Sequence, residues 1–356
     1  MSQKFMFFAG LSLGLSVSVV YQIYCGIQGF DGLQITALLP SVVRNTVKFS
    51  FLENTSSPLG ATEIIMQANR VIKTTTPSML LLQGDDTIAQ SLYTKVKVAC
   101  WILTSPSNLD RKAIYVKNTW SRKCTFVLFM SSVRNDSFPT VGLNTSEGRG
   151  HLTAKTMKAF QYLYDNHFDD ADWFMKADDD TYVIMENLRY FLSDEDPSQP
   201  IYFGQKLKPY IKMGYASGGA GYVISKESLR RFGLRGDNYT RTCKADTGHE
   251  DVEIARCMES LGVKLKPTFD NMNRHRFHFT SPEVYLRAKF SDQWKTVFDP
   301  EQGRSGIENI SNYAITFHYV SGSKMHDLEF YIYHLRPYGI LNLPLNLNVK
   351  NSSEID

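Results

Sequence analysis

Apolar and polar positions alternate with two different periods along the chain from about residue 95 onward. Short apolar runs at 96–103 and 124–130 predict buried strands. Between them, a turn at 104–108 contains helix-capping residues, and apolar residues follow helical spacing over 113–120. A strand, a helix and a second strand in this order predict a β-α-β unit with parallel strands.

The same alternation continues toward the C-terminus and predicts an α/β fold. Gly262 and Pro337 are stop signals after two of the helical patterns. The predicted helices lie at 152–164, 184–192, 229 onward, 254–261 and 325–335, and the further strands lie at 173–175, 200–204 and 314–320.

Three consecutive carboxylates, Asp178, Asp179 and Asp180, follow the apolar strand at 173–175 and precede the next helix. A turn between a strand and a helix is a usual place for ligand sites in α/β folds. Adjacent carboxylates repel one another, and a divalent cation would relieve that repulsion. Oxygen ligands suit Mg²⁺ or Mn²⁺, which also bind phosphate oxygens of substrates. The alternative is a solvated acidic turn that caps the following helix.

Other candidate residues have a structural interpretation as well as a functional one. Thr104, in the first βα turn, could contact a nucleotide or cap the helix. The glycines at 218–221 allow close approach of a ligand, or form a tight turn. Asp251 lies where a helix dipole favours acids, and where one carboxylate could act as a general base. His318 is either a structural histidine or a metal ligand that completes the acid site.

The N-terminal residues 5–24 carry no charged side chain and are long enough to span a bilayer. One lysine before this stretch and an aspartate after it favour a cytoplasmic N-terminus. We predict a cytoplasmic tail at 1–4, a signal-anchor helix at 5–27 and a lumenal stem at 28–94, which serves as a spacer. A cleaved signal peptide is the alternative.

Composition adds two indications about compartment and partners. Of the 356 residues 43% are hydrophobic and the net charge is only +3, so no nucleic-acid partner is expected. A lumenal address is supported by N-glycosylation acceptor sequences. These begin at Asn54, Asn135, Asn144, Asn238, Asn309 and Asn351.

The chain has five cysteines, and Cys25 falls at the end of the predicted anchor. The other four lack the CxxC spacing of a zinc site. Proximity in the sequence favours the disulfides Cys100–Cys124 and Cys243–Cys257. Four cysteines allow three connectivities, and four buried thiols are a further alternative.

Several of these stretches together resemble one family. Its motifs include Cys100-Trp-Ile-Leu-Thr-Ser-Pro, Asp172-Trp-Phe-Met-Lys-Ala-Asp-Asp-Asp-Thr-Tyr-Val and Ser217-Gly-Gly-Ala-Gly-Tyr-Val. The further motifs lie at 116–120, 127–132, 155–162, 202–204, 208–210, 250–251, 256–259, 317–320 and 333–339. In this order they resemble the core 1 β1,3-galactosyltransferases, the T-synthases, within the fringe-like β1,3-glycosyltransferases. The resemblance covers about residues 95–340.

The resemblance implies a GT-A fold, a single α/β nucleotide-sugar domain at 95–340, followed by a C-terminal tail at 341–356. It implies a type II membrane protein of the Golgi, with a homodimer as a possible assembly. It also implies transfer of galactose from UDP-galactose to the 3-hydroxyl of GalNAc on Ser or Thr of a glycoprotein, with inversion and with Mn²⁺.

Roles follow from the resemblance residue by residue. Asp178 and Asp180 match the DxD element and are expected to bind the metal together with His318, and Asp251 matches the proposed general base. Donor contacts are expected from Thr104, Lys155, Asp178 and Asp179. Acceptor contacts are expected from Tyr215, Gly218, Gly219, Glu250 and Trp294.

The chain departs from the family pattern in the acceptor half. T-synthases carry a Trp/Tyr-rich segment and then a paired Cys-Cys, whereas 290–305 is poor in aromatics and no cysteine follows Cys257. Trp294 and Phe298 are the remaining stacking candidates. Two alternatives follow: a Mn²⁺-dependent β1,3-hexosyltransferase with another acceptor, or a binding protein like the T-synthase chaperone, which lacks a functional DxD. The intact acids argue against the chaperone.

Overall fold

The computed structural model describes residues 86–235, 241–287 and 306–336. A seven-stranded sheet with the order β10-β6-β9-β4-β1-β2-β3 forms the centre of this part. Its strands are β1 (Val98–Leu103), β2 (Phe126–Ser131), β3 (Thr140–Gly142), β4 (Trp173–Asp178), β6 (Ile201–Gly204), β9 (Tyr222–Ser225) and β10 (Lys264–Leu265).

The sheet is mixed. The four strands β4, β1, β2 and β3 are parallel neighbours, which confirms the predicted β-α-β unit. β9 runs antiparallel between β4 and β6, and β10 is parallel to β6. All residues of β1, β6 and β9 are buried. Both faces of the sheet are covered, which explains why these strands are continuous apolar runs rather than alternating ones.

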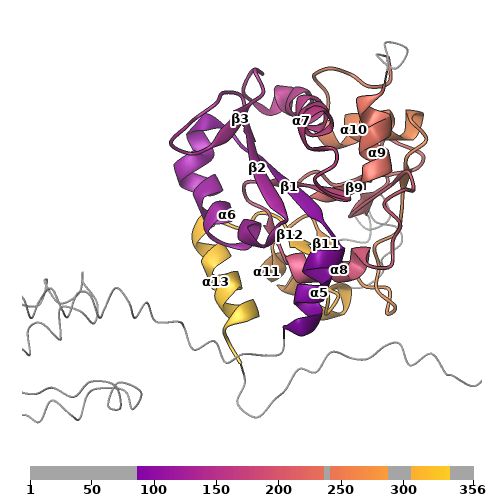
Figure 1. Ribbon diagram of the computed structural model, residues 1–356. Helices are drawn as coiled ribbons and strands as arrows, with labels where there is room; N and C mark the ends of the chain where they lie inside the picture. The colour runs from indigo at the N-terminus through magenta and orange to yellow at the C-terminus, as the bar shows by residue number, and fades with distance from the viewer. Residues whose placement is uncertain (1–85, 236–240, 288–305, 337–356) are drawn as a thin grey trace, which may run out of the picture. The chain divides into compact units, whose positions relative to one another are not determined.

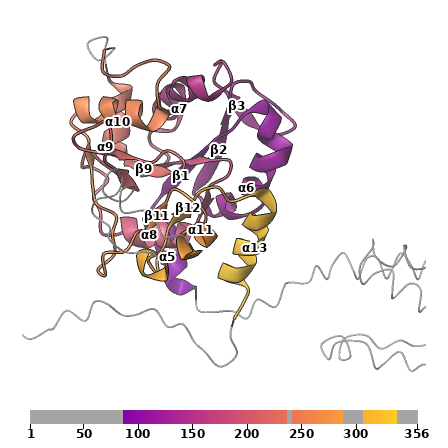
Figure 2. The ribbon, with the colours of Figure 1, turned by 180° about the vertical axis from the view of Figure 1, so that it is seen from behind.

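Helices cover the two faces of the sheet (Figure 1). On one face, α7 (Leu152–His167), α9 (Lys226–Gly233) and α10 (Glu250–Ser260) share an apolar cluster with Trp101, Phe174 and Tyr222 of the strands. On the other face lie α5 (Thr87–Lys95), α6 (Ile114–Asn118), α8 (Met185–Leu192) and α13 (Gly322–Tyr333). Figure 2 shows α13 beside α6, far from it in sequence.

A second, three-stranded sheet brings the C-terminal part of the chain to the end of β4. Its order is β11-β12-β5, with β11 at Phe277–His278, β12 at Thr316–Phe317 and β5 at Tyr182–Val183. β5 follows the three acids directly, and Phe317 pairs with Tyr182 across the antiparallel β12–β5 ladder. The strand predicted at 314–320 is therefore real but only two residues long.

Two smaller elements complete the described fold. β7 (Lys206–Leu207) and β8 (Tyr215–Ala216) form an antiparallel pair, and α11 (Pro282–Arg287) follows β11. The helix predicted over 113–120 is split into a π-helical segment at Leu109–Ala113, α6, and a 3-10 segment at Trp120–Lys123. Thr119 interrupts it because its backbone leaves the helical region and its hydroxyl donates to the Tyr115 carbonyl.

The N-terminal boundary differs from the prediction. α5 falls inside the predicted stem, yet Leu92 packs on the core and the Arg189 guanidinium lies 4.5 Å from the Tyr93 ring. The described fold therefore begins before residue 95. No helix within the described ranges is long and apolar enough to cross a bilayer, and the predicted anchor at 5–27 lies outside those ranges.

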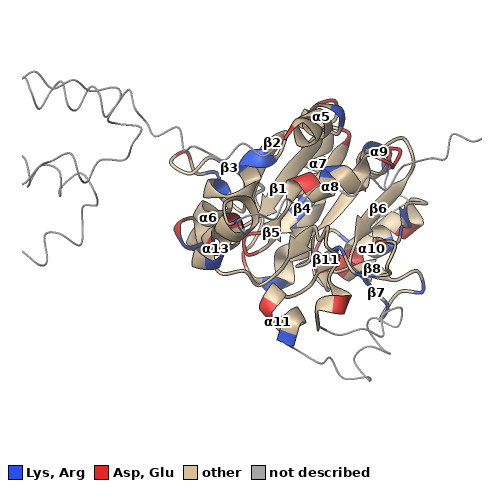
Figure 3. Ribbon diagram, turned by 90° about the horizontal axis from the view of Figure 1, so that it is seen from below, with Lys and Arg blue, Asp and Glu red and all other residues tan. Residues whose placement is uncertain are grey.

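Two remaining predictions concern cysteines and charge. The disulfides Cys100–Cys124 and Cys243–Cys257 are both present. Figure 3 shows Lys and Arg interspersed with Asp and Glu on helices and loops, while the strands of the large sheet are nearly free of charge.

Candidate active site

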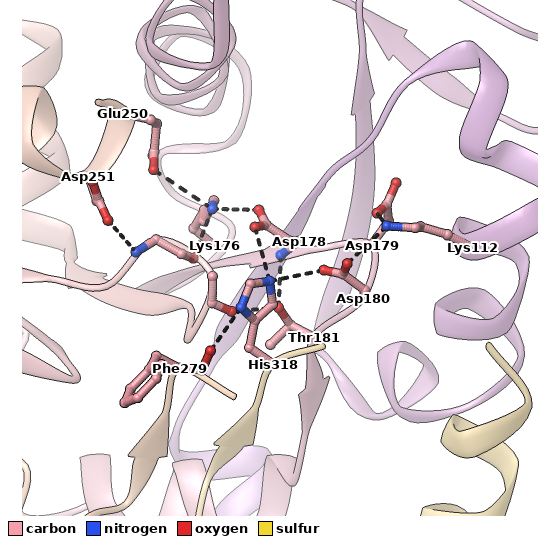
Figure 4. Close-up of polar contacts among 12 residues, drawn as sticks. Lys112, Lys176, Asp178, Asp179, Asp180, Thr181, Glu250, Asp251, Phe279 and His318 are labelled. Atoms are coloured by element: carbon pink, nitrogen blue, oxygen red, sulfur yellow. Dashed lines mark hydrogen bonds and ion pairs between the residues drawn. The ribbon is translucent and has the colours of Figure 1, made fainter. Parts of the chain in front are cut away.

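The predicted acids lie at the C-terminal end of β4, where the chain leaves the large sheet (Figure 4). Asp178 is the last residue of β4, and Asp179 and Asp180 form the turn that leads into β5. The Thr181 amide donates to the Asp178 carbonyl at 3.1 Å, and the Thr181 hydroxyl donates to the Gly219 carbonyl at 2.8 Å. These bonds fix the turn against the glycine segment.

His318 faces two of these acids from the end of β12 (Figure 4). Its Nδ1 lies 3.0 Å from the Phe279 carbonyl, which can only accept, so Nδ1 carries a hydrogen. Nε2 then points to the acids, 3.2 Å from Asp180 Oδ1 and 3.9 Å from Asp178 Oδ2. A hydrogen-bonded Nδ1 that fixes the ring and presents Nε2 is the usual arrangement of a metal-binding histidine.

The three side chains fit a divalent cation. One ligand atom from each of Asp178, Asp180 and His318 lies within 4.8 Å of the others, and all three residues are partly exposed. Two carboxylates and one imidazole form a mixed oxygen and nitrogen donor set of the kind that binds divalent metals. Gly219 makes room for the histidine, because a Cβ at this position would lie 2.1 Å from His318 Cε1.

Asp179 and Asp180 are adjacent but have opposite environments. Asp179 is buried and accepts hydrogen bonds from the Thr104 hydroxyl at 2.8 Å and the Asn108 amide at 2.9 Å. Burial raises the pKa of Asp179 to about 6 in spite of these bonds. Burial also opposes the charge on Asp180, but His318 and Lys112 outweigh it and lower the pKa of Asp180 to about 2. Asp180 is therefore the acid held ready in its charged form.

Lys176 is a buried part of the site that the sequence analysis missed. It is 1% exposed, and its ammonium donates to Asp178 Oδ1 at 2.6 Å and to the Gly218 carbonyl at 2.9 Å. Burial disfavours its charge, but Asp178 and Glu250 outweigh burial and raise the pKa of Lys176. Lys176 lies two residues before Asp178 in a strand, so both side chains point to the same face of the sheet. This spacing could have identified Lys176 from the sequence.

Glu250 and Asp251, at the start of α10, lie on the other side of Lys176 (Figure 4). Glu250 is buried, and its carboxylate accepts from the Thr156 hydroxyl at 2.9 Å and the Tyr222 hydroxyl at 2.8 Å. Burial raises the pKa of Glu250. Asp251 is half-buried, and its Oδ2 accepts from the Gly218 amide at 3.1 Å. Of the two, Asp251 is the acid that a substrate can reach.

A cavity of about 320 Å³ adjoins Asp180. Lys112 lines it and donates to Asp180 Oδ2 at 2.9 Å. Tyr319 also lines it, with φ +54°, and its ring lies 3.9 Å from the His318 ring in a stacked arrangement. The full lining is Asn108, Arg111, Lys112, Asp180, Tyr319, Val320, Ser321 and Gly322. The cavity thus presents basic side chains and one aromatic ring next to the acids.

The other predicted site residues have different positions. Lys155 is 2% exposed, and its ammonium donates to the Thr104 carbonyl at 3.0 Å and to the Glu147 carboxylate at 2.8 Å, so it supports the turn after β1. Tyr215 is buried on β8. Trp294 lies outside the described residues. Donor binding by Thr104 and Lys155, and acceptor binding by Tyr215 and Trp294, stay predictions.

Comparison with known proteins adds to this geometry. Residues 102–295 match the family model described as Fringe-like. The chain is 48% identical over 263 residues to glycoprotein-N-acetylgalactosamine 3-beta-galactosyltransferase 1 of Xenopus laevis, covering 72% of each chain. It is 28% identical over 196 residues to the beta-1,3-glucosyltransferase of Mus musculus, covering 54% of this chain and 38% of that one. A solved galactosyltransferase, LgtC with donor and acceptor sugar analogs, aligns at TM-score 0.40 and 12% identity, over 67% of this chain and 98% of that one.

Proposed function

Because the chain belongs to the Fringe-like family, with a 3-beta-galactosyltransferase among its near relatives, we propose that it is a β1,3-galactosyltransferase. It transfers galactose from UDP-galactose to the 3-hydroxyl of N-acetylgalactosamine linked to Ser or Thr of a glycoprotein. The observation that carries this proposal is the convergence of Asp178, Asp180 and His318, which supply ligand atoms from two different sheets.

These three residues would hold Mn²⁺ in the proposed enzyme. When bound, the ion supplies positive charge that binds diphosphate oxygens and stabilises the departing UDP. The cavity beside Asp180 is the proposed place for the diphosphate, since Arg111 and Lys112 line it and carry the opposite charge. Lys112 pairs with Asp180 here, and a diphosphate would give its ammonium a second anionic partner.

Asp251 is the proposed general base. Its Oδ2 is oriented by the Gly218 amide, and the side chain is half-buried and so open to a substrate. The acceptor hydroxyl gives its proton to this carboxylate as its oxygen attacks the anomeric carbon of galactose. The bond from that carbon to the UDP oxygen breaks in the same displacement. One displacement inverts the anomeric centre, so the reaction needs one base and no enzyme nucleophile.

The cellular setting belongs to the same proposal. A type II anchor at 5–27 would hold the enzyme in the Golgi membrane with residues 28–356 in the lumen. Two disulfides, which form in oxidising compartments, support the lumenal address.

The test measures galactose transfer to a GalNAc-peptide by the purified full-length protein, with Mn²⁺ or with chelator. We expect transfer in Mn²⁺ only, none from Asp180→Ala, and at least a hundredfold loss from Asp251→Asn with UDP binding retained. Asp136→Asn, at an exposed acid paired with Arg134, is the matched control. Donor hydrolysis without transfer would indicate another acceptor. Failure to bind UDP at all would favour the chaperone-like alternative.

A further inference from the structure

Two exposed rings lie at the N-terminus of α10, and the proposed mechanism does not use them. Tyr210 is 66% exposed. Its ring centroid lies 6.2 Å from that of His249, with 22° between the planes, so the rings are stacked. His249 is exposed as well and directly precedes Glu250 and Asp251. Exposed aromatic surface beside a candidate catalytic acid is typical of a ligand-binding groove.

The backbone holds Tyr210 in this outward position. Its φ is +77°, in the left-handed region that bulky residues rarely adopt. The next residue, Ile211, is buried and packs with Val252 and Ala255 of α10. The loop between β7 and β8 is thereby anchored on the helix that carries Asp251. Strained conformations of this kind persist where the surroundings fix them, and they occur often at binding sites.

Tyr215 joins these rings to the active site. Its ring centroid lies 6.3 Å from that of Tyr210, and it is buried beneath the exposed pair. Three residues further along the chain, Gly218 donates its amide hydrogen to Asp251. The same two segments, 210–218 and 249–251, therefore build both the aromatic stack and the candidate base.

The chemistry of the stack favours a neutral sugar ring. An aromatic face is electron-rich, and the C–H groups on one face of a pyranose are weakly positive, so the two faces attract. A galacto-configured pyranose has such a face because its axial 4-hydroxyl leaves the C–H groups at carbons 3, 4 and 5 together on the other side. The donor diphosphate, by contrast, has its basic cavity beside Asp180.

We propose that Tyr210 and His249 form a stacking subsite for the acceptor sugar ring, which orients the acceptor hydroxyl toward Asp251. The subsite rests on the proposed function, because a sugar acceptor is what the transferase reaction requires. It also supplies aromatic contacts from outside 290–305, the segment in which the sequence analysis placed the stacking candidates Trp294 and Phe298.

The test compares steady-state transfer by full-length wild-type protein, Tyr210→Ala, Tyr210→Phe and His249→Ala, with GalNAc-peptide and UDP-galactose varied separately. Tyr331→Ala, at an exposed tyrosine of α13, is the control. We expect Tyr210→Ala and His249→Ala to raise the acceptor KM about tenfold. The donor KM and Mn²⁺-dependent hydrolysis of UDP-galactose should be unchanged. Tyr210→Phe keeps the ring and should remain within about twofold of wild type.

The outcomes separate this inference from the proposed function. If wild type transfers to GalNAc-peptide but Tyr210→Ala keeps its acceptor KM, the subsite is refuted and the function stands. If Tyr210→Ala loses donor hydrolysis equally, the effect is structural and the subsite is also refuted. If wild type accepts another hexoside instead, the proposed acceptor is wrong, and the subsite stands only if Tyr210→Ala raises the KM for that hexoside. If wild type accepts no hexoside, both fail.

Discussion

Gly219→Ala offers the sharpest test of the proposed metal site, because it adds one methyl group and changes no proposed ligand. Gly219 has no left-handed φ, so an alanine there is not strained by its own backbone. Its effect is therefore confined to what the added Cβ meets, which is His318 alone among the nearest atoms. We expect the variant to fold and to lose metal affinity.

The size of the loss follows from the distances. The Cβ would lie 2.1 Å from His318 Cε1 and 2.3 Å from Nδ1, whereas non-bonded carbon atoms in contact lie about 3.5–4.0 Å apart. The ring must withdraw by roughly 1–2 Å, which breaks the 3.0 Å bond to the Phe279 carbonyl and moves Nε2 from the acids. Loss of such an orienting bond alone lowers metal affinity about 10- to 100-fold, or about 1.4–2.8 kcal/mol.

Mn²⁺ binding is measured by the decrease of the free-ion EPR signal during titration of wild type, Gly219→Ala, His318→Ala and the double variant. Gly150→Ala is the matched control, since a Cβ there meets no atom within 4 Å. The two single variants act on one ligand, so the double variant should lose little more than either. Wild-type affinity in Gly219→Ala, with an unchanged melting temperature, would refute the assignment of His318 as a ligand.

Three further predictions concern stability. Lys176→Met should lower the free energy of unfolding by about 3–5 kcal/mol, because it leaves the buried Glu250 carboxylate and the partly exposed Asp178 carboxylate without their cation; a urea midpoint equal to that of exposed Lys158→Met would contradict this. The pKa of buried His278 is lowered from 6.5 to about 3 by desolvation, so the unfolded chain binds the extra proton and stability falls as pH drops from 6.5 toward 3. The His278 contribution to the slope should approach about 1.4 kcal/mol per pH unit, so the slope of wild type and that of His278→Gln should differ by about this amount; an equal slope in both would exclude this contribution. Replacing Cys243 and Cys257 together by Ala opens a short loop and should reduce stability by about 3 kcal/mol, measured by urea unfolding; an unchanged midpoint would show that the disulfide contributes nothing.

The elements that local patterns specify were predictable. The apolar runs gave β1, β2 and β4, and helical spacing gave α7 and α10 to within a few residues of their bounds. The acids were predicted in a turn after a buried strand; Asp179 and Asp180 lie in that turn, whereas Asp178 is the last residue of β4. Each of these signals is contained in a stretch of sequence long enough to show its period.

Other features depend on pairings between distant segments and could not be predicted in that way. β5, β11 and β12 are two residues long, too short to show alternation, and only their mutual pairing makes them strands. The antiparallel pairing of β9 with β4 and β6 likewise depends on contacts between segments that are distant in sequence. Lys112 and Tyr319 join the site only through the folded chain, whereas Lys176 could have been found from its two-residue spacing to Asp178.

The proposed metal ligands come from two sheets, and this has a consequence for biosynthesis. Asp178 and Asp180 leave the ribosome long before His318, which is separated from them by most of the domain. A partly synthesised chain therefore has the acids but not the complete ligand set, and high-affinity loading must await the β12–β5 pairing. High-affinity metal binding would then indicate that the domain has finished folding. A chain truncated before β12 would bind the ion weakly even if the large sheet had already formed.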